Sequence, residues 1–184
     1  MMIAPFTIAV DTREQLPFSF QGIRIDRKKA FVLTQRRTLP TGDYGIVGYE
    51  NRIGIERKSL EDLYQTLGTG RERFVRELER MQDMDFSAVV VEASLGQVKD
   101  PKKDDPLWHS QMNPDSVLGT IIAFAGQYHK TRWKFAGNRA NAEKITFKLL
   151  LQYYHAIKDE TEPFDTRQAL GTPAKDSGSP ESAG

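Results

Sequence analysis

The sequence predicts an α/β domain in which helices flank a mixed β-sheet. Short apolar runs, of which residues 88–91 are the clearest, predict strands that are buried on both faces. Segments with apolar residues at helical spacing, such as residues 71–84, predict amphipathic helices. The elements follow one another in the order β-β-β-β-α-α-β-α-β-α, which is typical of a sheet covered by helices.

The composition suits one soluble domain, with 184 residues, of which 39% are hydrophobic and 28% charged. The chain has no cysteine, which excludes a disulfide framework and a thiolate zinc site. No apolar run approaches the ~18 residues of a membrane helix, and residues 1–6 lack the segments of a secretory signal. We therefore expect an intracellular location. With a net charge of only +1, DNA binding has to come from local basic clusters.

The first strand is predicted at residues 7–10, a β-branched and apolar run. Charged residues follow at its end: Asp11, Arg13 and Glu14. These side chains either face water where the strand passes into a loop or belong to a functional site. A further strand is predicted at residues 30–35, and the Pro and Gly of residues 39–43 predict a turn before the next strand.

A β-hairpin is predicted next. Residues 48–51 supply its turn and residues 52–58 its second strand. Asp43 lies where the first strand begins, whereas Glu56 and Lys58 lie near the end of the antiparallel neighbour. Because Glu56 and Lys58 are two residues apart, they point to the same side of the strand. Two carboxylates and one ammonium group therefore converge.

This group of side chains has a chemical use. Two carboxylates bind a hard divalent cation such as Mg²⁺ through their oxygens. The cation polarises a phosphoryl oxygen and acidifies a bound water, and a neighbouring lysine orients that water or stabilises developing negative charge. The alternative is an exposed hairpin whose charged ends only face water.

The motif Gly42-Asp43, Glu56-Arg57-Lys58 and Asp62 resembles the signature G-D-x(n)-E-R-K-x3-D of the XPF-type structure-specific endonucleases. Residues 10–14, Val-Asp-Thr-Arg-Glu, resemble the first-strand motif of the same family. Residues 60–67 and 89–93 fall where the family places its next elements, so the resemblance covers roughly residues 6–158.

The resemblance implies a restriction-endonuclease-like fold and a Mg²⁺-dependent DNA endonuclease, with Mn²⁺ able to substitute. The implied substrate is branched, flap or fork DNA in repair or recombination, and the implied product is a nick with a 5′-phosphate and a 3′-hydroxyl. Asp43 and Glu56 are expected to hold the metal, with Asp11 and Glu14 assisting.

The basic residues of these motifs have implied roles as well. Lys58 is expected to position the water or to steady the pentacovalent phosphate, and Arg57 to contact phosphate or neighbouring carboxylates. Arg13 is expected to contact a phosphate or to hold Asp11 and Glu14 in place.

A short helix is predicted after the hairpin, with Ser59 as its N-cap and Gly68 as its C-cap. Asp62 in its first turn suits the positive end of the helix dipole. The resemblance adds support of the active site as a second role for Asp62, and the two roles are compatible.

The next helix, at residues 71–84, has an apolar side and an opposite side with three arginines: Arg73, Arg76 and Arg80. Together with the interspersed Glu72, Glu77 and Glu79, these arginines form either a solvated face or a rail for the DNA backbone. Arg71 lies at the helix N-terminus after Gly-Thr-Gly, a place suited to a phosphate. Arg71 and Arg73 are therefore the expected DNA contacts of this helix.

A central strand is predicted at residues 86–93, and residues 95–111 hold a polar and charged loop at residues 99–106. Asn113 as N-cap and Pro114 at the first helical position begin a helix that extends to residue 128. A last strand and a last helix follow, at residues 132–136 and 137–158.

Both late helices carry more apolar surface than one sheet face needs. Either a deep single-domain core takes up this surface, or the helices form a dimer interface. The resemblance implies a dimer, because nucleases of this family work as dimers through the nuclease domain. DNA and a second subunit, either identical or a DNA-binding partner, are therefore the expected partners.

The nuclease domain is expected to span residues 1–158, and residues 159–184 are expected to form a polar, disordered tail. Many relatives carry a C-terminal tandem helix-hairpin-helix DNA-binding domain, which is not expected here. Three explanations stay open: lower selectivity, dependence on a partner, or a compact bacterial or phage version of the enzyme. The alternatives are a DNA-end-processing nuclease and a non-catalytic scaffold subunit. A complete acidic and basic motif argues against the scaffold: Asp43, Glu56, Arg57 and Lys58.

Overall fold

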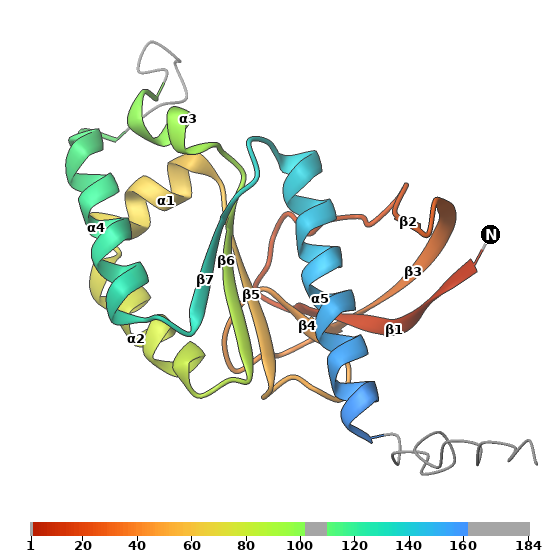
Figure 1. Cartoon of the computed structure of the whole chain (residues 1–184). Coiled ribbons are helices and arrows are strands. Elements are labelled where there is room, and N and C mark those ends of the chain that lie inside the picture. The colour runs from red at the N-terminus through yellow and green to blue at the C-terminus, as the bar shows by residue number, and fades with distance from the viewer. Residues whose placement is uncertain (1, 102–109, 162–184) are drawn as a thin grey trace, which may run out of the picture.

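The structure of the chain is a computed structural model that describes residues 2–101 and 110–161 (Figure 1). Seven strands form one sheet with the strand order β2-β3-β1-β4-β5-β6-β7. The elements are β1 (Met2–Asp11), β2 (Arg24–Ile25), β3 (Lys28–Arg37), β4 (Tyr44–Ile46), β5 (Ile53–Lys58), α1 (Leu60–Leu67), α2 (Arg71–Gln82), β6 (Phe86–Val91), α3 (Leu95–Lys99), α4 (Pro114–Gln127), β7 (Thr131–Phe135) and α5 (Arg139–Thr161). No helix in these described ranges is both long and apolar enough to cross a membrane.

The sheet is mixed, as the sequence predicts. Strands β4 and β5 pair antiparallel, with Tyr44 opposite Ile55, so the predicted hairpin is confirmed. β4 also pairs antiparallel with β1, whereas β1 with β3, β5 with β6, and β6 with β7 are parallel pairs. The antiparallel β4 therefore joins the parallel pair β1–β3 to the parallel strands β5–β7, and β2 pairs antiparallel with β3 at the edge of the sheet.

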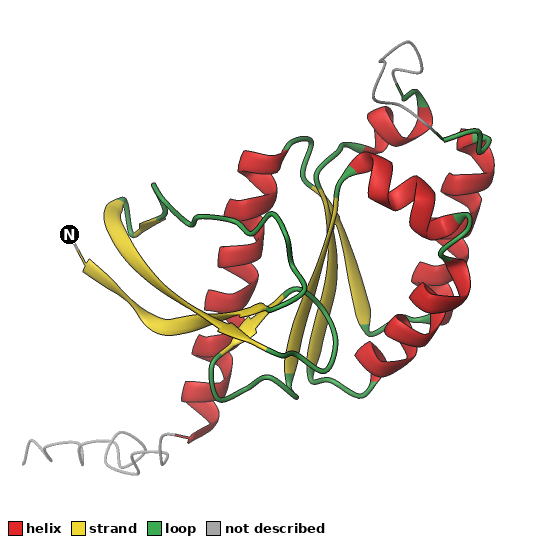
Figure 2. Ribbon diagram, turned by 180° about the vertical axis from the view of Figure 1, so that it is seen from behind, coloured by secondary structure: helices red, strands yellow, loops and turns green. Residues whose placement is uncertain are grey.

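Helices cover both faces of the β5–β7 half. Figures 1 and 2 show α5 on one side of these strands and α1, α2 and α4 on the other. Alternate residues of β6 enter the two cores: Ala88 and Val90 pack in the core with α5, and Val89 and Val91 in the core with the other helices. This two-sided burial explains why β6 is a continuous apolar run.

Most predicted helix ends are confirmed. The Ser59 hydroxyl accepts the N–H of Asp62 and caps α1, which ends at the C-cap Gly68. The Asn113 side chain accepts the N–H of Asp115, and Pro114 is the first residue of α4.

Several elements differ from the prediction, and β1 has the largest change of bounds because it begins at Met2 and not at residue 7. The short β2 was not predicted, because two residues carry no readable alternation. The helix α3 at residues 95–99 was not predicted, although a Ser94–Gln97 capping box begins it, and most of the polar loop predicted at residues 99–106 lies outside the described residues. The helix α5 extends to Thr161, and the rest of the predicted tail lies outside the described residues.

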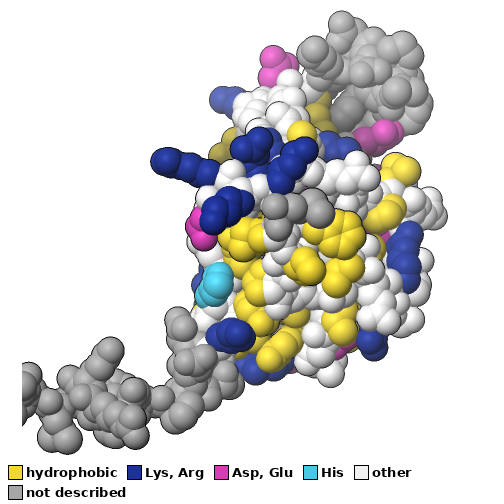
Figure 3. Space-filling model, turned by 90° about the vertical axis from the view of Figure 1, so that its right-hand side faces the viewer, with side chains coloured by type: hydrophobic (Ala, Val, Ile, Leu, Met, Phe, Trp, Pro, Cys, Tyr) yellow, Lys and Arg dark blue, Asp and Glu magenta, His cyan; other side chains and the backbone are white. Residues whose placement is uncertain are grey.

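The β1–β3 end of the sheet leaves an apolar surface exposed. Ile3, Phe31 and Leu33 have relative exposures of 67%, 50% and 46%. Figure 3 views the molecule from this side and shows hydrophobic side chains gathered together, with lysine and arginine side chains along their upper edge. Among the described residues, helices therefore cover both faces of the sheet at β5–β7, whereas the β1–β3 end keeps an exposed face.

Candidate active site

The register of β5 separates its three charged residues. Glu56, Arg57 and Lys58 lie opposite Val89, Val90 and Val91 of the parallel neighbour β6. Paired residues of neighbouring strands share a face, so Glu56 and Lys58 face α1 and α2, whereas Arg57 faces α5. The Lys58 ammonium donates to the Glu56 carboxylate, which confirms that these two side chains point to the same side.

Asp43 joins Glu56 and Lys58 from the end of the hairpin next to β4. Its Oδ2 accepts the backbone N–H of Arg57 at 2.8 Å. Burial and then the negative charge of Glu56 raise the pKa of Asp43 to about 8. The structure therefore brings together the two carboxylates and the lysine that the sequence predicts.

Gly42 is the residue that allows this close approach. Its φ of +78° lies in the left-handed region, and an added Cβ would lie 3.1 Å from the backbone nitrogen of Ile55. A glycine before Asp43 therefore lets the start of β4 pack directly against the backbone of β5.

The Lys58 ammonium is held as a cation in a nearly closed site. Lys58 is only 7% exposed, and its Nζ lies 5.3 Å from the centroid of the Phe74 ring on α2. Burial alone would lower the pKa of Lys58, but the negative charges of Glu56, Glu77 and Asp43 together outweigh burial and raise this pKa.

A third carboxylate lies in this group. Glu77 of α2 is half-buried, whereas sequence analysis placed it among the charges of the arginine side of the helix. Burial and then the charge of Glu56 raise the pKa of Glu77 to about 8. The sequence contains a signal for this position, because Glu77 lies three residues after Phe74 and four before Met81, both buried, and so flanks the apolar stripe.

Arg57 lies on the opposite face in a network of ion pairs. Its Nε is 2.9 Å from Glu14 Oε2 and its Nη1 is 3.0 Å from Glu92 Oε1, while Arg139 Nη1 contacts the same Glu92 oxygen at 2.7 Å. The Arg57 side chain is only 10% exposed. Of the two roles expected for Arg57, contact with carboxylates is the one that this geometry provides.

The pKa values of this network follow from its pairing. Burial alone would raise the pKa of Glu14, but hydrogen bonds from Arg57 and the Leu16 N–H lower it. Burial alone would lower the pKa of Arg57, but Glu14 raises it instead. The Glu14 carboxylate and the Arg57 guanidinium are therefore both charged and form an ion pair.

Asp11 has a separate set of partners near the end of β1. Its carboxylate accepts the Arg13 N–H, Arg13 Nε at 2.7 Å, Arg13 Nη2 at 3.0 Å and the Leu39 N–H at 2.8 Å. Burial alone would raise the pKa of Asp11, but these hydrogen bonds lower it below its ordinary value. Arg13 therefore holds Asp11, as one of its expected roles requires.

Replacing Asp11 with asparagine is expected to lower the free energy of unfolding at pH 7 by about 1–3 kcal/mol. Both carboxylate oxygens of Asp11 accept hydrogen bonds, whereas the asparagine amide has only one acceptor oxygen. The folded pKa lies below the ordinary value of 3.8, so this stabilisation is present above pH 3.8 and is lost as pH falls through the folded pKa. Urea unfolding at pH 7 and pH 3 measures the difference, with the exposed Asp26→Asn as control. An equal loss at both pH values would contradict the assignment.

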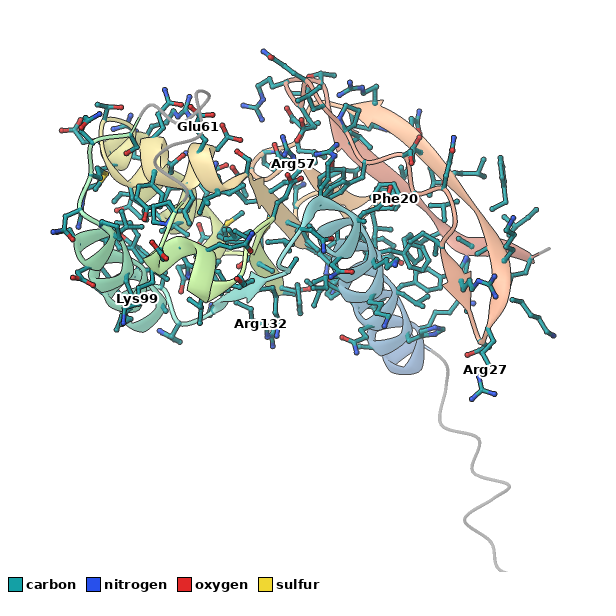
Figure 4. All side chains as sticks on the ribbon, turned by 90° about the horizontal axis from the view of Figure 1, so that it is seen from above. Phe20, Arg27, Arg57, Glu61, Lys99 and Arg132 are labelled. Carbon is teal, nitrogen blue, oxygen red and sulfur yellow. The ribbon has the colours of Figure 1, made fainter. Side chains whose placement is uncertain are left out.

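The other predicted residues lie at the edges of the site. Asp62 is exposed in the first turn of α1, as helix stabilisation requires. Arg71 is engaged with α4, because its Nη1 donates to Thr120 Oγ1 at 3.2 Å and its guanidinium lies 4.9 Å from the centroid of the Phe124 ring. Arg73 is exposed. Figure 4, seen from above, shows Arg57 between Glu61 of α1 and Phe20.

The donor set suits a hard divalent cation. Nowhere in the described ranges do three or more histidine, aspartate or glutamate side chains already form a cation cage. Asp43 and Glu56 offer carboxylate oxygens, the donors that Mg²⁺ prefers. The negative charge of Glu56 raises the pKa of Asp43, and a divalent cation would relieve this repulsion.

Comparisons with known proteins found one family model and solved structures with a similar fold. A family model described as ERCC4 domain matches residues 10–149. The structure of XPF from Aeropyrum pernix is similar to this chain, with a TM-score of 0.56 and 16% identity over 84% of this chain and 68% of that chain. A second similar structure, XPF from Aeropyrum pernix in complex with DNA, has a TM-score of 0.51 and 19% identity over 88% and 69%. No curated protein sequence matches significantly. The predicted restriction-endonuclease-like fold is confirmed.

Proposed function

Because the chain belongs to the ERCC4 domain family, we propose that it is a Mg²⁺-dependent endonuclease that cuts DNA at branched, flap or fork structures. The observation that carries this proposal is the convergence of Asp43, Glu56 and Lys58 in a partly buried site beside α2. The complex of Aeropyrum pernix XPF with DNA supports DNA as the substrate.

Each residue of the site has a chemical task in phosphodiester hydrolysis. Asp43 and Glu56 would hold the metal, which when bound supplies Lewis-acid activation of the phosphate and of a water. Lys58, fixed by Glu56 and by the Phe74 ring, stabilises negative charge that develops on the phosphate. The water oxygen bonds to phosphorus as the bond to the 3′-oxygen breaks, which leaves a 5′-phosphate and a 3′-hydroxyl.

The DNA backbone requires cations outside this group. The Arg13 side chain is 68% exposed although it is paired with Asp11, and Arg73 is exposed on α2. We assign phosphate contacts to these two arginines, because a guanidinium fits phosphate geometry. The engagement of Arg71 with Thr120 and Phe124 makes it the weaker candidate.

Labelled DNA substrates test the proposal directly. A 3′-flap, a splayed fork, a linear duplex and a single strand are incubated with Mg²⁺ or Mn²⁺, with wild type and Glu56→Gln side by side. Cutting near the junction by wild type alone is expected. Equal cutting of all substrates would support phosphodiester hydrolysis at this site but would contradict a preference for branched DNA. No cutting by the folded wild-type protein would favour a scaffold subunit.

We also propose that the chain forms a homodimer through α4. The apolar surface of α5 is largely taken up by the core of this chain, whereas Ile122 of α4 is 65% exposed beside small exposed residues such as Ala123 and Gly126. Light scattering is expected to give twice the chain mass of 20.9 kDa at micromolar concentration. Ile122→Lys is expected to halve this mass, whereas Gln127→Lys, exposed at the end of the same helix, is not. A monomeric wild type would exclude the dimer.

A further inference from the structure

One face of the sheet carries both the candidate active site and the exposed apolar residues of the β1–β3 end. The opposite face packs on α5 along most of the sheet, since Ile8 of β1, Ile46 of β4 and Ile55 of β5 belong to one core with Phe147 of α5. Side chains alternate between the two faces of a strand. The residues next to these core positions therefore share the face of Glu56.

Strand β3 continues this face beyond the active site. Its Ala30 and Val32 pack against the core with α5, so Phe31 and Leu33 point to the other face, where Phe31 lies opposite Ile3 of β1. Among the described residues, no helix lies over this end of the sheet on that side (Figures 1 and 2). We call the surface of Ile3, Phe31 and Leu33 the open face, and exposed apolar surface of this kind marks a binding site.

A row of paired residues connects the open face to the active site. Arg37 of β3 lies opposite Asp11 of β1, and the Asp11 N–H donates to the Asp43 carbonyl at 2.8 Å. The Asp43 N–H donates in turn to Ile55, the residue before Glu56. With about 4.8 Å between neighbouring strands, three strand spacings place Arg37 about 14 Å from Glu56 across the sheet. A ligand at the active site therefore reaches β3 without leaving this face.

The charge around the open face suits phosphate. Residues 24–37 hold six basic residues and one acidic residue, a net charge of +5, whereas the whole chain has a net charge of +1. Lys29 and Arg37 are exposed and lie an even number of residues from Phe31, which puts them on its face of β3. Figure 3 shows lysine and arginine side chains along one edge of the apolar patch. A second copy of the chain would bring equal positive charge against this surface, which disfavours a dimer here.

We propose that the open face binds the single-stranded arm of branched DNA. This inference rests on the proposed function, because it takes DNA at Asp43 and Glu56 as its starting point. The Phe31 ring is a platform for a stacked base, and Lys29 and Arg37, before and after it on the strand, contact phosphates. From Lys29 to Arg37 the strand spans about 26 Å. At about 3.4 Å per phosphate, this length accommodates at most about eight nucleotides.

Fluorescence anisotropy with labelled DNA tests the open face without a cleavage assay. The probes are oligothymidine of about 15 nucleotides, longer than the face accommodates, and a duplex of the same length, both in EDTA so that no DNA is cut. Phe31→Ala is expected to weaken oligothymidine binding about 5-fold or more, the effect of losing one base stack, with little change for duplex. Leu95→Ala on α3 is the control, because its exposure of 49% matches the 50% of Phe31.

Two conservative variants separate stacking from simple apolar contact. Phe31→Tyr keeps an aromatic ring and is expected to bind oligothymidine like wild type. Phe31→Leu keeps only apolar contact and is expected to match Phe31→Ala. All three variants are expected to stay folded, because half of the Phe31 side chain is already exposed.

The salt dependence of binding tests the phosphate contacts. Lys29→Ala is expected to weaken oligothymidine binding and to lower the slope of log affinity against log salt by about 0.7, the value for one phosphate of a single strand. Lys148→Ala, exposed on α5, is expected to leave affinity and slope unchanged.

The outcomes separate this inference from the proposed function. Wild-type affinity for oligothymidine in both Phe31→Ala and Lys29→Ala would overturn the inference, whereas fork cutting that Glu56→Gln abolishes would still support the nuclease. Weakened binding in these variants, with no cutting by wild type, would support the open face and remove the nuclease. Wild-type binding by Phe31→Leu would overturn the inference in favour of an apolar protein partner. A lower light-scattering mass of Phe31→Ala would assign the face to a second copy and overturn it as well.

Discussion

Asp43→Asn is expected to reduce DNA cleavage by about 10³-fold or more, the scale on which a site loses a main electrostatic contributor to its transition state. The amide keeps the shape of the side chain and an oxygen for the N–H of Arg57, so the fold is expected to survive. A gel assay on fork DNA with Mg²⁺ measures the loss. The exposed Asp26→Asn, with the same chemical change, is the control.

The same variant carries a prediction for stability in the absence of metal. The folded pKa of Asp43, about 8, lies above its ordinary value of 3.8, so the unfolded state binds fewer protons between these pH values. The contribution of Asp43 to stability therefore falls as pH rises from about 4 to about 8. In EDTA, Asp43→Asn is expected to unfold at a higher Tm than wild type at pH 8 and at an equal Tm near pH 4. Undiminished cleavage by this variant would refute the assignment of the site.

The sequence predicts the hairpin and its chemistry because both depend on local spacing. Alternation along a strand places Glu56 beside Lys58, and the Gly42-Asp43 turn precedes the antiparallel partner. The caps Ser59 and Asn113 are local as well, because each bonds an N–H within three residues. Features of this kind need no knowledge of the tertiary fold.

The partners of Arg57 and Glu77 depend on tertiary packing instead. Arg57 meets Glu14 and Glu92, which are 43 and 35 residues away, only because β5 lies near the end of β1 and beside β6. The face of β5 that carries Arg57 packs toward α5, so the Arg57 side chain lies on the opposite side of the strand from Glu56 and Lys58. For Glu77 the helical spacing gave a usable signal, but whether its side chain faces solvent or the site depends on how α2 packs against the sheet.

The two faces of β5 therefore have different tasks. The face toward α2 holds carboxylates whose repulsion a metal would relieve, whereas the face toward α5 holds carboxylates that arginines already neutralise. Arg57 joins the ends of β1 and β6 through Glu14 and Glu92, and Arg139 at the start of α5 completes the network. The ion pairs of Arg57 and Arg139 therefore connect the ends of β1, β5 and β6 with α5, whereas the face toward α2 holds Asp43 and Glu56 beside the single ammonium of Lys58.

Arg57→Met is consequently expected to lower the free energy of unfolding by about 3–5 kcal/mol at pH 7, because it leaves Glu14 and Glu92 as buried carboxylates without their shared partner. Urea unfolding measures this loss, and Arg76→Met on the exposed side of α2 is expected to cost little.

Neutralising Glu14 and Glu92 as well distinguishes two roles of Arg57: a clamp, which here means an ion-pair partner of these two carboxylates, and a contact with the DNA phosphate. If Arg57 is a clamp, the triple variant Arg57→Met, Glu14→Gln, Glu92→Gln recovers much of the lost stability, because no uncompensated charge remains in the buried network. If Arg57 instead acts on the DNA phosphate, Arg57→Met loses cleavage while its unfolding curve stays at that of wild type. The second result would require the Arg57 guanidinium to leave Glu14 when DNA binds, and the clamp would then be a resting contact of the free enzyme.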